Sequence, residues 1–248
     1  MFKKYTRMDS SEGNVWKYIF ESDDAIAEAV LYRYESFEKR TVICCSVQSG
    51  CPVGCKFCGT GKRFVRNLQS TEITQQVQDI ITDMKIAHND CEKFQIMFMS
   101  MGEPMLNWYS VYNAIDVLHS LYPSAQLLLS TIGINDNDVQ SGILEISKRI
   151  EKVGLQFSIH EALEERRNVL IPFKNKMTLR DIRDFGMLWN QITGRKSFLN
   201  YCVTRDNTTT ESIQRLKDLF SPMYFNLTFS VVCSSDISIH APYTGCDN

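Results

Sequence analysis

The sequence predicts an α/β fold built on a parallel β-sheet, with a short antiparallel pair of strands in front of it. Six apolar segments alternate with amphipathic segments of helical period between about residues 40 and 232. Alternation of this kind is typical of right-handed βαβ units, whose strands lie parallel in one sheet. Six such units fit either an open doubly wound sheet or an incomplete barrel, and in both the chemistry gathers at the carboxyl ends of the strands.

The antiparallel pair consists of residues 15–20 and 25–34, joined by a turn at residues 22–24. The first parallel strand is predicted at residues 40–47, RTVICCSV, which are rich in apolar and β-branched side chains. Residues 94–100, FQIMFMS, are a continuous apolar run that suits a buried strand. The remaining strands are predicted at residues 126–131, 155–160, 196–203 and 224–232.

Helical segments separate these strands. In residues 71–86 the apolar side chains of Ile73, Val77, Ile80 and Met84 fall on one face of a helix. The other helices are predicted at residues 108–121, 139–150, 178–192 and 209–220.

The composition is that of a globular protein with a large core. The chain has 248 residues, of which 44% are hydrophobic and 23% charged, so its length fits one large domain or two small ones. The formal net charge of −2 excludes a chain-wide basic field, and any contact with nucleic acid requires a local basic patch. We expect neither a membrane span nor export, because there is no run of 18 apolar residues and no secretion signal.

Nine cysteines are an odd number in a chain of this length, which argues against a secreted disulfide scaffold. We therefore expect a reducing, cytoplasmic location, where clustered thiols more often serve metal or redox chemistry. Three of them, Cys51, Cys55 and Cys58, lie in SGCPVGCKFCGTGKR directly after the first parallel strand. Three close thiolates can hold zinc together with a fourth ligand, or three irons of a 4Fe-4S cluster, which leaves one iron for a small molecule.

Polar residues also follow the next three predicted strands. MSMGEPMLN contains Gly102 and Glu103, LSTIGI contains Ser130, and FSIH contains Ser158 and His160. A carboxylate at a buried strand end is costly when unpaired, so Glu103 is expected to have a cationic partner. Polar clusters at the ends of four successive strands predict a binding site at this edge of the sheet.

The spacing C-x3-C-x2-C after a first strand resembles the radical S-adenosylmethionine (SAM) superfamily, and the segment around Glu103 resembles its GGEP motif. The resemblance implies that the three cysteines hold a 4Fe-4S cluster, whose open iron chelates the amino and carboxylate groups of SAM. One electron, from a donor such as flavodoxin or ferredoxin, then cleaves a carbon–sulfur bond and yields a 5′-deoxyadenosyl radical. The implied SAM contacts are Gly102, Glu103, Ser130, Ser158, Ile159 and His160.

A narrower resemblance rests on segments that appear in one order: AEAVLYRY, TVICCSVQSGCPVGCKFCGTG, MGEPMLN, STIGI and SIHEALEERRNVLIPF. Over roughly residues 13–232 the chain resembles the RlmN/Cfr family, whose members methylate an adenine ring carbon of ribosomal RNA and, in some cases, of transfer RNA. The resemblance implies an incomplete parallel (β/α)6 barrel at residues 40–235, after a β-hairpin extension at 1–39 and before a tail at 236–248.

The family mechanism uses two cysteines and a base. A cysteine first accepts a methyl group from SAM, and a second SAM supplies the radical that takes a hydrogen atom from that methyl group. The carbon radical adds to carbon 2 of adenine, a base removes the ring proton, and the other cysteine resolves the protein–RNA link as a disulfide. By position, Glu28 resembles the base, Cys44 the resolving cysteine and Cys246 the methyl carrier.

Three features depart from the family pattern, and one is Val231, which stands where the family usually has Asn near the end of the last strand. The chain begins almost at the hairpin, where the family has an N-terminal RNA-contacting domain, and the residues around Cys246 do not match the family motif. Three hypotheses follow: an RNA adenine-carbon methyltransferase, a radical SAM enzyme that acts on another substrate and lacks the carrier cysteine, and a zinc-bearing RNA-binding module without catalysis. Lys56, Lys62, Arg63 and Arg66 around the cysteine loop are expected to supply the local basic patch.

Overall fold

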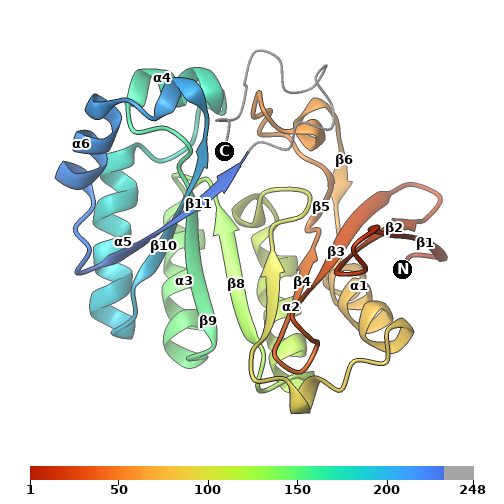
Figure 1. Ribbon diagram of the computed structural model, residues 1–248. Helices are drawn as coiled ribbons and strands as arrows, with labels where there is room; N and C mark the ends of the chain where they lie inside the picture. Colours follow the sequence, from red (N-terminus) through yellow and green to blue (C-terminus); the bar gives the residue numbers. More distant parts are fainter. Residues whose placement is uncertain (232–248) are drawn as a thin grey trace.

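The computed structural model describes residues 1–231, and in it nine strands form one sheet in the order β1-β2-β3-β4-β7-β8-β9-β10-β11 (Figure 1). Neighbouring strands are antiparallel from β1 to β4 and parallel from β4 to β11. The strands are β1 (Lys4–Asp9), β2 (Val15–Glu21), β3 (Ile26–Tyr34), β4 (Arg40–Cys45), β7 (Phe94–Phe98), β8 (Gln126–Thr131), β9 (Val153–Ser158), β10 (Ser197–Val203) and β11 (Phe225–Val231).

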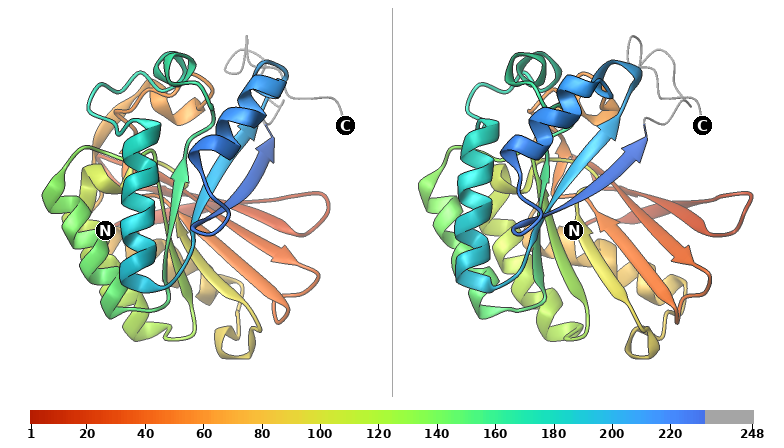
Figure 2. Two further views of the ribbon diagram at one scale, coloured as in Figure 1. Left: turned by 90° about the vertical axis from the view of Figure 1, so that its left-hand side faces the viewer. Right: turned by 60° about the vertical axis from the view of Figure 1, so that its left-hand side comes forward.

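Helices connect the parallel strands and pack along one face of the sheet, as the turned views show (Figure 2). The α-helices are α1 (Ser70–Asp83), α2 (Trp108–Leu121), α3 (Asn137–Arg149), α4 (Glu164–Leu170), α5 (Leu179–Thr193) and α6 (Thr210–Leu219). Short 3-10 helices lie at η1 (Gly59–Lys62), η2 (His88–Asp90), η3 (Pro104–Asn107) and η4 (Arg205–Asn207).

The side chains of each parallel strand alternate between the two faces of the sheet, because successive residues of a strand point to opposite sides. On β7, Phe94, Ile96 and Phe98 are buried in the core, whereas Gln95 and Met97 are only half-buried. The helices therefore cover an apolar face, and the opposite face carries a mixture of amide, hydroxyl and apolar groups.

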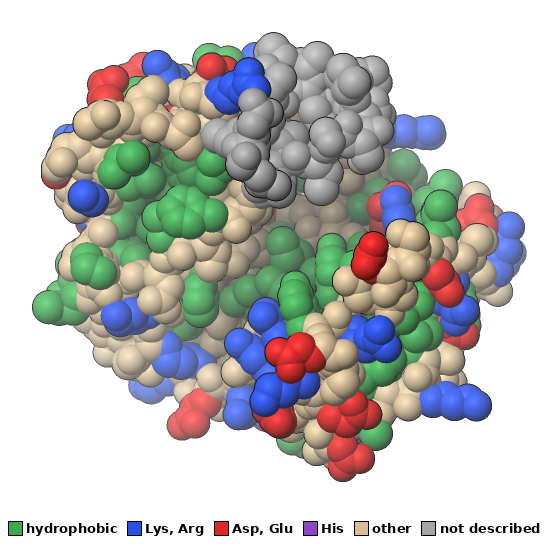
Figure 3. Space-filling view, in the orientation of Figure 1, with side chains coloured by type: hydrophobic (Ala, Val, Ile, Leu, Met, Phe, Trp, Pro, Cys, Tyr) green, Lys and Arg blue, Asp and Glu red, His purple; other side chains and the backbone are tan. Residues whose placement is uncertain are grey.

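We call this second face the open face, and Figure 3 shows that it is hollowed. On β8 to β11 its side chains follow the same period of two, and residues from its two ends line separate cavities. Its residues on the parallel strands include Cys44, Gln95, Met97, Gln126, Leu128, Ser130, Gly154, Gln156, Ser158, Phe198, Asn200, Cys202, Thr228 and Ser230.

The predicted α/β fold with a parallel sheet after an antiparallel hairpin is confirmed, and all six predicted parallel strands are present. Among residues 1–231 the sheet has two edges, at β1 and β11, so closure into a partial barrel stays a prediction. The division at residue 39 also stays a prediction, and β3 pairs directly with β4 across it. The expected tail at residues 236–248 lies outside the described residues.

Three strands and one α-helix were not predicted from the sequence. Strand β1, KYTRMD, has six exposed residues and so lacks the apolar alternation that marks a half-buried strand. Strands β5 (Gln48–Gly50) and β6 (Phe64–Asn67) form a small antiparallel sheet on either side of the cysteine loop, and they are too short to show a period. Helix α4 has only seven residues, most of them charged or polar.

In the part of the chain that the structure describes, we find no helix with the length and apolar character needed to cross a membrane.

Candidate active site

The predicted site residues come together in a cavity of about 440 Å³ at the carboxyl ends of the parallel strands. All three cysteines of the loop border it, together with the turn after β7 and the ends of β8 to β11. Its polar lining residues are Cys51, Cys55, Cys58, Thr60, Ser100, Glu103, Ser130, Thr131, Ser158, His160, Asn200, Cys202 and Ser230. Of the predicted SAM contacts, only Ile159 is not among the lining residues, because its side chain is fully buried in the core.

The cysteine loop is held by the small sheet of β5 and β6. The amide of Cys51 donates to the carbonyl of Arg63 (3.0 Å), and the amide of Cys58 donates to the carbonyl of Cys55 (3.1 Å). Gly50 has a φ of +79°, and a Cβ there would collide with the carbonyl oxygen of Arg63. Glycine is therefore required where the two short strands approach each other.

Burial raises the pKa of two of the loop thiols, Cys51 and Cys55. The pKa of Cys51 is raised to about 12, and that of Cys55 is raised as well, mainly by desolvation and further by neighbouring acidic groups. Such thiols become thiolates at neutral pH only when a bound cationic group compensates their charge. Within residues 1–231, no three His, Cys, Asp or Glu side chains are grouped closely enough for a single metal ion. Three thiols around a cavity of this volume fit a cluster of several atoms together with a ligand.

The turn between β7 and α2 presents the carboxylate of Glu103 to the cavity. Gly102 has a φ of +98°, and the next amide, of Glu103, donates to the side-chain oxygen of Gln48 (2.9 Å). The Glu103 carboxylate accepts hydrogen bonds from the hydroxyl of Thr131 and the amides of Ile132 (2.9 Å) and Met105 (3.0 Å).

The carboxylate of Glu103 has three hydrogen bonds but is only 3% exposed. Desolvation raises its pKa to about 7, against the opposing effect of those hydrogen bonds. The cationic partner expected from the sequence is not found within residues 1–231, where Glu103 forms no ion pair. A cationic group of a ligand is therefore the partner that this carboxylate can accept.

Hydroxyl and amide groups cross the open face next to Glu103. The hydroxyls of Ser130 and Ser158 lie 3.4 Å apart, and the side-chain amide of Gln156 donates to Ser130 (3.0 Å). Further along the sheet, the hydroxyl of Ser230 donates to the side-chain oxygen of Asn200 (3.2 Å). Asn200 and Ser230 were missed in the sequence, although each is a polar residue inside an apolar strand.

His160 is held in a neutral form. Desolvation and, to a smaller extent, the nearby positive charge of Arg167 together lower its pKa to about 3. Its Nδ1 accepts a hydrogen bond from the amide of Cys202 (3.1 Å), so the neutral ring carries its proton on Nε2. The ring packs edge-on against Phe57, with their centroids 4.9 Å apart.

The predicted catalytic residues Glu28 and Cys44 do not line this cavity, but both lie on the open face. Cys44 pairs with Met97 of β7 and with Val30 of β3, and Glu28 is two residues before Val30. Glu28 forms an ion pair with Lys17 (2.8 Å), and burial raises the pKa of Cys44 to about 12. Cys246 lies outside the described residues.

Arg66, one of the four residues of the expected basic patch, forms ion pairs within the protein. The guanidinium of Arg66 contacts both carboxylate oxygens of the buried Glu72, each at 2.8 Å, and a carboxylate oxygen of Asp24 at 2.8 Å. Its charge is therefore already balanced by two carboxylates, and its part in the expected basic patch stays a prediction. These contacts fix β6 against α1.

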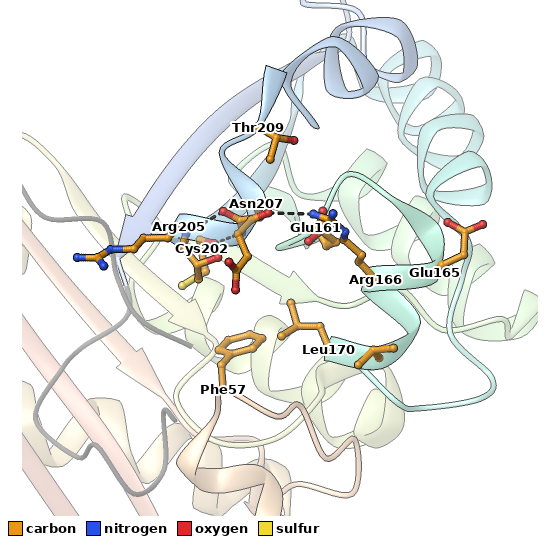
Figure 4. A pocket seen from close by; sticks show the side chains of 12 residues that line it. Phe57, Glu161, Glu165, Arg166, Leu170, Cys202, Arg205, Asn207 and Thr209 are labelled. Atoms are coloured by element: carbon orange, nitrogen blue, oxygen red, sulfur yellow. Dashed lines mark hydrogen bonds between the residues drawn. The ribbon is translucent and has the colours of Figure 1, made fainter. Parts of the chain in front are cut away.

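A second cavity of about 660 Å³ adjoins the first, and Phe57 and Cys202 line both (Figure 4). It lies between α4 and the segment after β10, where the guanidinium of Arg166 donates to the carbonyl of Asp206 (2.9 Å). Glu161 and Leu170 also line it, so its wall mixes charged and apolar groups.

Most of the chain is similar to curated RNA methyltransferases. A probable RNA methyltransferase from Rhodopirellula baltica is 33% identical over 223 residues, which are 87% of this chain and 56% of that protein. Probable dual-specificity RNA methyltransferases RlmN from Desulfitobacterium hafniense and Flavobacterium psychrophilum are 32% and 34% identical, over 86% and 85% of this chain and 60% of each relative. The chain thus spans less than two thirds of the length of these relatives. No protein-family model matches it.

Solved structures share the fold. A radical SAM methyltransferase from Sphaerobacter thermophilus superposes with a TM-score of 0.83 at 23% identity, over 98% of this chain and 70% of that one. SuiB from Streptococcus suis superposes with a TM-score of 0.56 at 14% identity, over 80% of this chain and 40% of that one.

Replacing Gly102 with Ala tests the turn that presents Glu103. A Cβ at Gly102 would lie 2.6 Å from the Cβ of Gln48, at a φ that L-residues rarely adopt. We expect Gly102→Ala to lower the free energy of unfolding by roughly 1–3 kcal/mol from backbone strain, with the collision adding to it. Gly13→Ala is the matched control, since Gly13 has a φ of +60° with no atom within 4 Å of its Cβ position. Equal losses in the two variants, measured by urea unfolding, would show that the contact with Gln48 is unimportant.

Proposed function

We propose that this chain, which belongs to the RlmN/Cfr-like radical SAM family, methylates an adenine ring carbon of RNA. The observation that carries the proposal is the single cavity that joins three loop cysteines to the buried carboxylate of Glu103. Three thiolates and one carboxylate lacking a cation suit a 4Fe-4S cluster and the ammonium group of SAM. The RNA-modifying names of the relatives support RNA as the substrate.

When bound, the cluster and SAM supply a carbon-centred radical that can abstract a hydrogen atom. In this proposal Cys51, Cys55 and Cys58 hold the cluster, and Glu103 accepts the hydrogen bonds of the SAM ammonium. Ser130 and Ser158 offer hydroxyls from two neighbouring strands at the same end of the sheet. His160 stays neutral and packs against Phe57, so it adds no positive charge beside the substrate.

Carbon 2 of adenine, in ribosomal or transfer RNA, is the proposed position of methylation. The assignment is supported by the placement of Glu28 and Cys44 on the same open face as the cavity. The radical adduct would first give up its unpaired electron, for which the bound cluster would be the acceptor. Glu28 would accept the ring proton, and Cys44 would attack the sulfur of the methylene-bridged carrier, proposed to be Cys246. The new disulfide leaves the electron pair with the methylene carbon, which takes up a proton to become the methyl group.

An electron donor such as flavodoxin or ferredoxin and a reducing, cytoplasmic location complete the proposal. In support, the seven cysteines of residues 1–231 form no disulfide with one another. A radical SAM reaction on another substrate, and a zinc-bearing module without catalysis, are the alternatives that the following experiments separate.

The first experiment concerns the cluster. We expect anaerobically reconstituted protein to contain about four irons and to absorb visible light, and Cys51→Ala, Cys55→Ala and Cys58→Ala each to lose both properties. Cys91→Ala is the matched control, because Cys91 is half-buried near the opposite end of the sheet and donates to the carbonyl of Ala87. Metal analysis that finds stoichiometric zinc without iron would favour the zinc-bearing module instead.

The second experiment concerns the ammonium of SAM. Glu103→Gln retains the shape and removes the charge, and loss of a charge-assisted hydrogen bond of roughly 1.5–3 kcal/mol should weaken SAM binding about 10- to 150-fold. Since burial raises the pKa of Glu103 to about 7, ionisation of the carboxylate should make wild-type affinity rise between about pH 6 and pH 7.5. The Gln variant should lack that rise, as calorimetry would show.

Glu161→Gln is the control for this experiment, because Glu161 is also buried but lines the neighbouring cavity. Affinity for SAM that is unchanged in Glu103→Gln, or reduced equally in Glu161→Gln, would contradict the assignment of Glu103.

The third experiment concerns the two proposed catalytic cysteines. Cys246→Ala should release no S-adenosylhomocysteine, because it has no first methyl acceptor, whereas Cys44→Ala should accumulate a covalent protein–RNA adduct. Cys45→Ala is the control, since Cys45 is the neighbouring residue on the opposite, core face of β4. Denaturing gels and mass spectrometry of the intact protein would detect the adduct and the methyl group. RNA methylation by Cys246→Ala at the wild-type rate would refute its role as carrier, and a wild type that never releases S-adenosylhomocysteine would favour another substrate.

A further inference from the structure

A third cavity, of about 560 Å³, lies on the open face at the opposite end of the strands. We call it the lower cavity, and we call the cavity of about 440 Å³ that is lined by the three loop cysteines the upper cavity. It is lined where β4, β7, β8, β9 and β10 begin, by residues that include Gln95, Gln126, Gln156 and Phe198. The proposed reaction makes no use of this cavity.

The strand period of two places the lower and the upper cavity on the same face of the sheet. On β8, Gln126 and Leu128 line the lower cavity, and Ser130, two residues further on, lines the upper one. On β9 the same relation holds for Gln156 and Ser158. Residues that share parity on a strand share a face, and four residues span about 13 Å. Along this surface Gln126, at the far end of the lower cavity, is therefore about 13 Å from Ser130, and Leu128, at its near end, is about 7 Å from Ser130.

The rim of the lower cavity is strongly basic. Its lining contains five cationic side chains and a single acidic one, Glu151. The five are Arg40, Lys93, Lys152, Arg195 and Lys196. Since the whole chain has a net charge of −2, this is a local concentration of positive charge. Figure 3 shows Lys and Arg side chains below the hollow of the open face, with Asp and Glu side chains among them.

Some of these cations are held in place and others are available. The guanidinium of Arg195 donates to the carbonyl of Val153 (2.7 Å), and the ammonium of Lys196 donates to the carbonyl of Pro222 (2.6 Å). Neither interaction neutralises the charge, because a carbonyl is uncharged. Lys93 and Lys152 are exposed, and within residues 1–231 neither forms an ion pair. The strands are about 4.8 Å apart, so from β4 to β10 the cations extend over about 19 Å of the sheet.

We propose that this basic rim, formed by Arg40, Lys93, Lys152, Arg195 and Lys196, binds backbone phosphates of the RNA substrate on either side of the base that enters the open face. The inference rests on the proposed function, since RNA is the polyanion that the reaction requires. Lysine and arginine contacts to phosphate supply most of the sequence-independent affinity for nucleic acid. An enzyme that acts on a ring atom extrudes the base into its site while the flanking backbone stays outside. The geometry suits this arrangement, because the cationic side chains lie where the strands begin and the proposed reaction site lies where the strands end.

The test uses the full chain, reconstituted with its cluster, and a 20-nucleotide RNA hairpin with adenines in its loop. The double variant Lys93→Gln/Lys152→Gln removes two phosphate contacts. At about 0.7 units per contact, the slope of log K against log salt should become shallower by about 1.4, and affinity at about 0.1 M salt should fall about 20-fold. The control double variant Lys148→Gln/Lys217→Gln removes two exposed lysines from α3 and α6, and it should bind RNA as the wild type does.

SAM affinity is measured in the same samples, and it should be unchanged in both double variants. RNA binding with wild-type affinity and salt slope in Lys93→Gln/Lys152→Gln would overturn the rim as the RNA surface while leaving the proposed function intact. An equal loss in the control variant would also overturn it, because the effect would then follow net charge alone. A wild type that cleaves SAM but binds no RNA at any salt would refute the proposed function itself.

Discussion

The buried carboxylate of Glu103 is the interaction on which the cavity depends. It joins the end of β7 to the end of β8 through Thr131 and Ile132, and the amide of Glu103 joins both to the cysteine loop through Gln48. Gln48 in turn donates to the side chain of Asn67 on β6 (2.8 Å). One acidic residue thereby fixes three segments that are far apart in the sequence. Because a buried carboxylate is stable only where its hydrogen bonds are complete, its position is set more strictly than that of an exposed turn.

The two faces of the parallel sheet have separate tasks. The covered face supplies stability: Phe157 of β9, for instance, packs edge-on against Phe185 of α5, with centroids 6.2 Å apart. The open face carries groups such as Gln156 and Ser158, which contribute hydrogen bonds instead of apolar burial. The side chains of the open face, including those proposed to react or to contact the RNA backbone, can therefore be changed with little effect on the core. That separation is possible because the period of a strand is two.

The sequence predicted what is encoded locally. The cysteines and the Gly102–Glu103 turn lie in short motifs at the ends of strands, and strand ends meet at one edge whatever the exact register. Asn200 and Ser230 were missed because their role depends on which face each residue occupies, and a shift of one residue reverses it. The pairing of Glu28 with Lys17 depends on the register of β2 and β3, and the basic rim gathers cations from segments more than 150 residues apart. A local sequence pattern cannot predict contacts of this kind, because the residues come together only in the folded sheet.

The electrostatics of the upper cavity link ligand binding to stability. An acid whose pKa is raised in the folded state binds its proton more tightly there than in the unfolded chain, so stability falls as pH rises above the unfolded pKa. For Glu103 that loss begins near pH 4.5 and continues to about pH 7, and for Cys51 it lies between about pH 9 and pH 12. A cationic ligand reverses the relation, because it favours the ionised carboxylate and thiolates. Burial disfavours the ionised carboxylate and thiolates when no ligand is bound, and a ligand with positive charge removes that penalty when it binds. A neutral ligand of similar size does not remove the penalty, so the cavity favours ligands that carry positive charge.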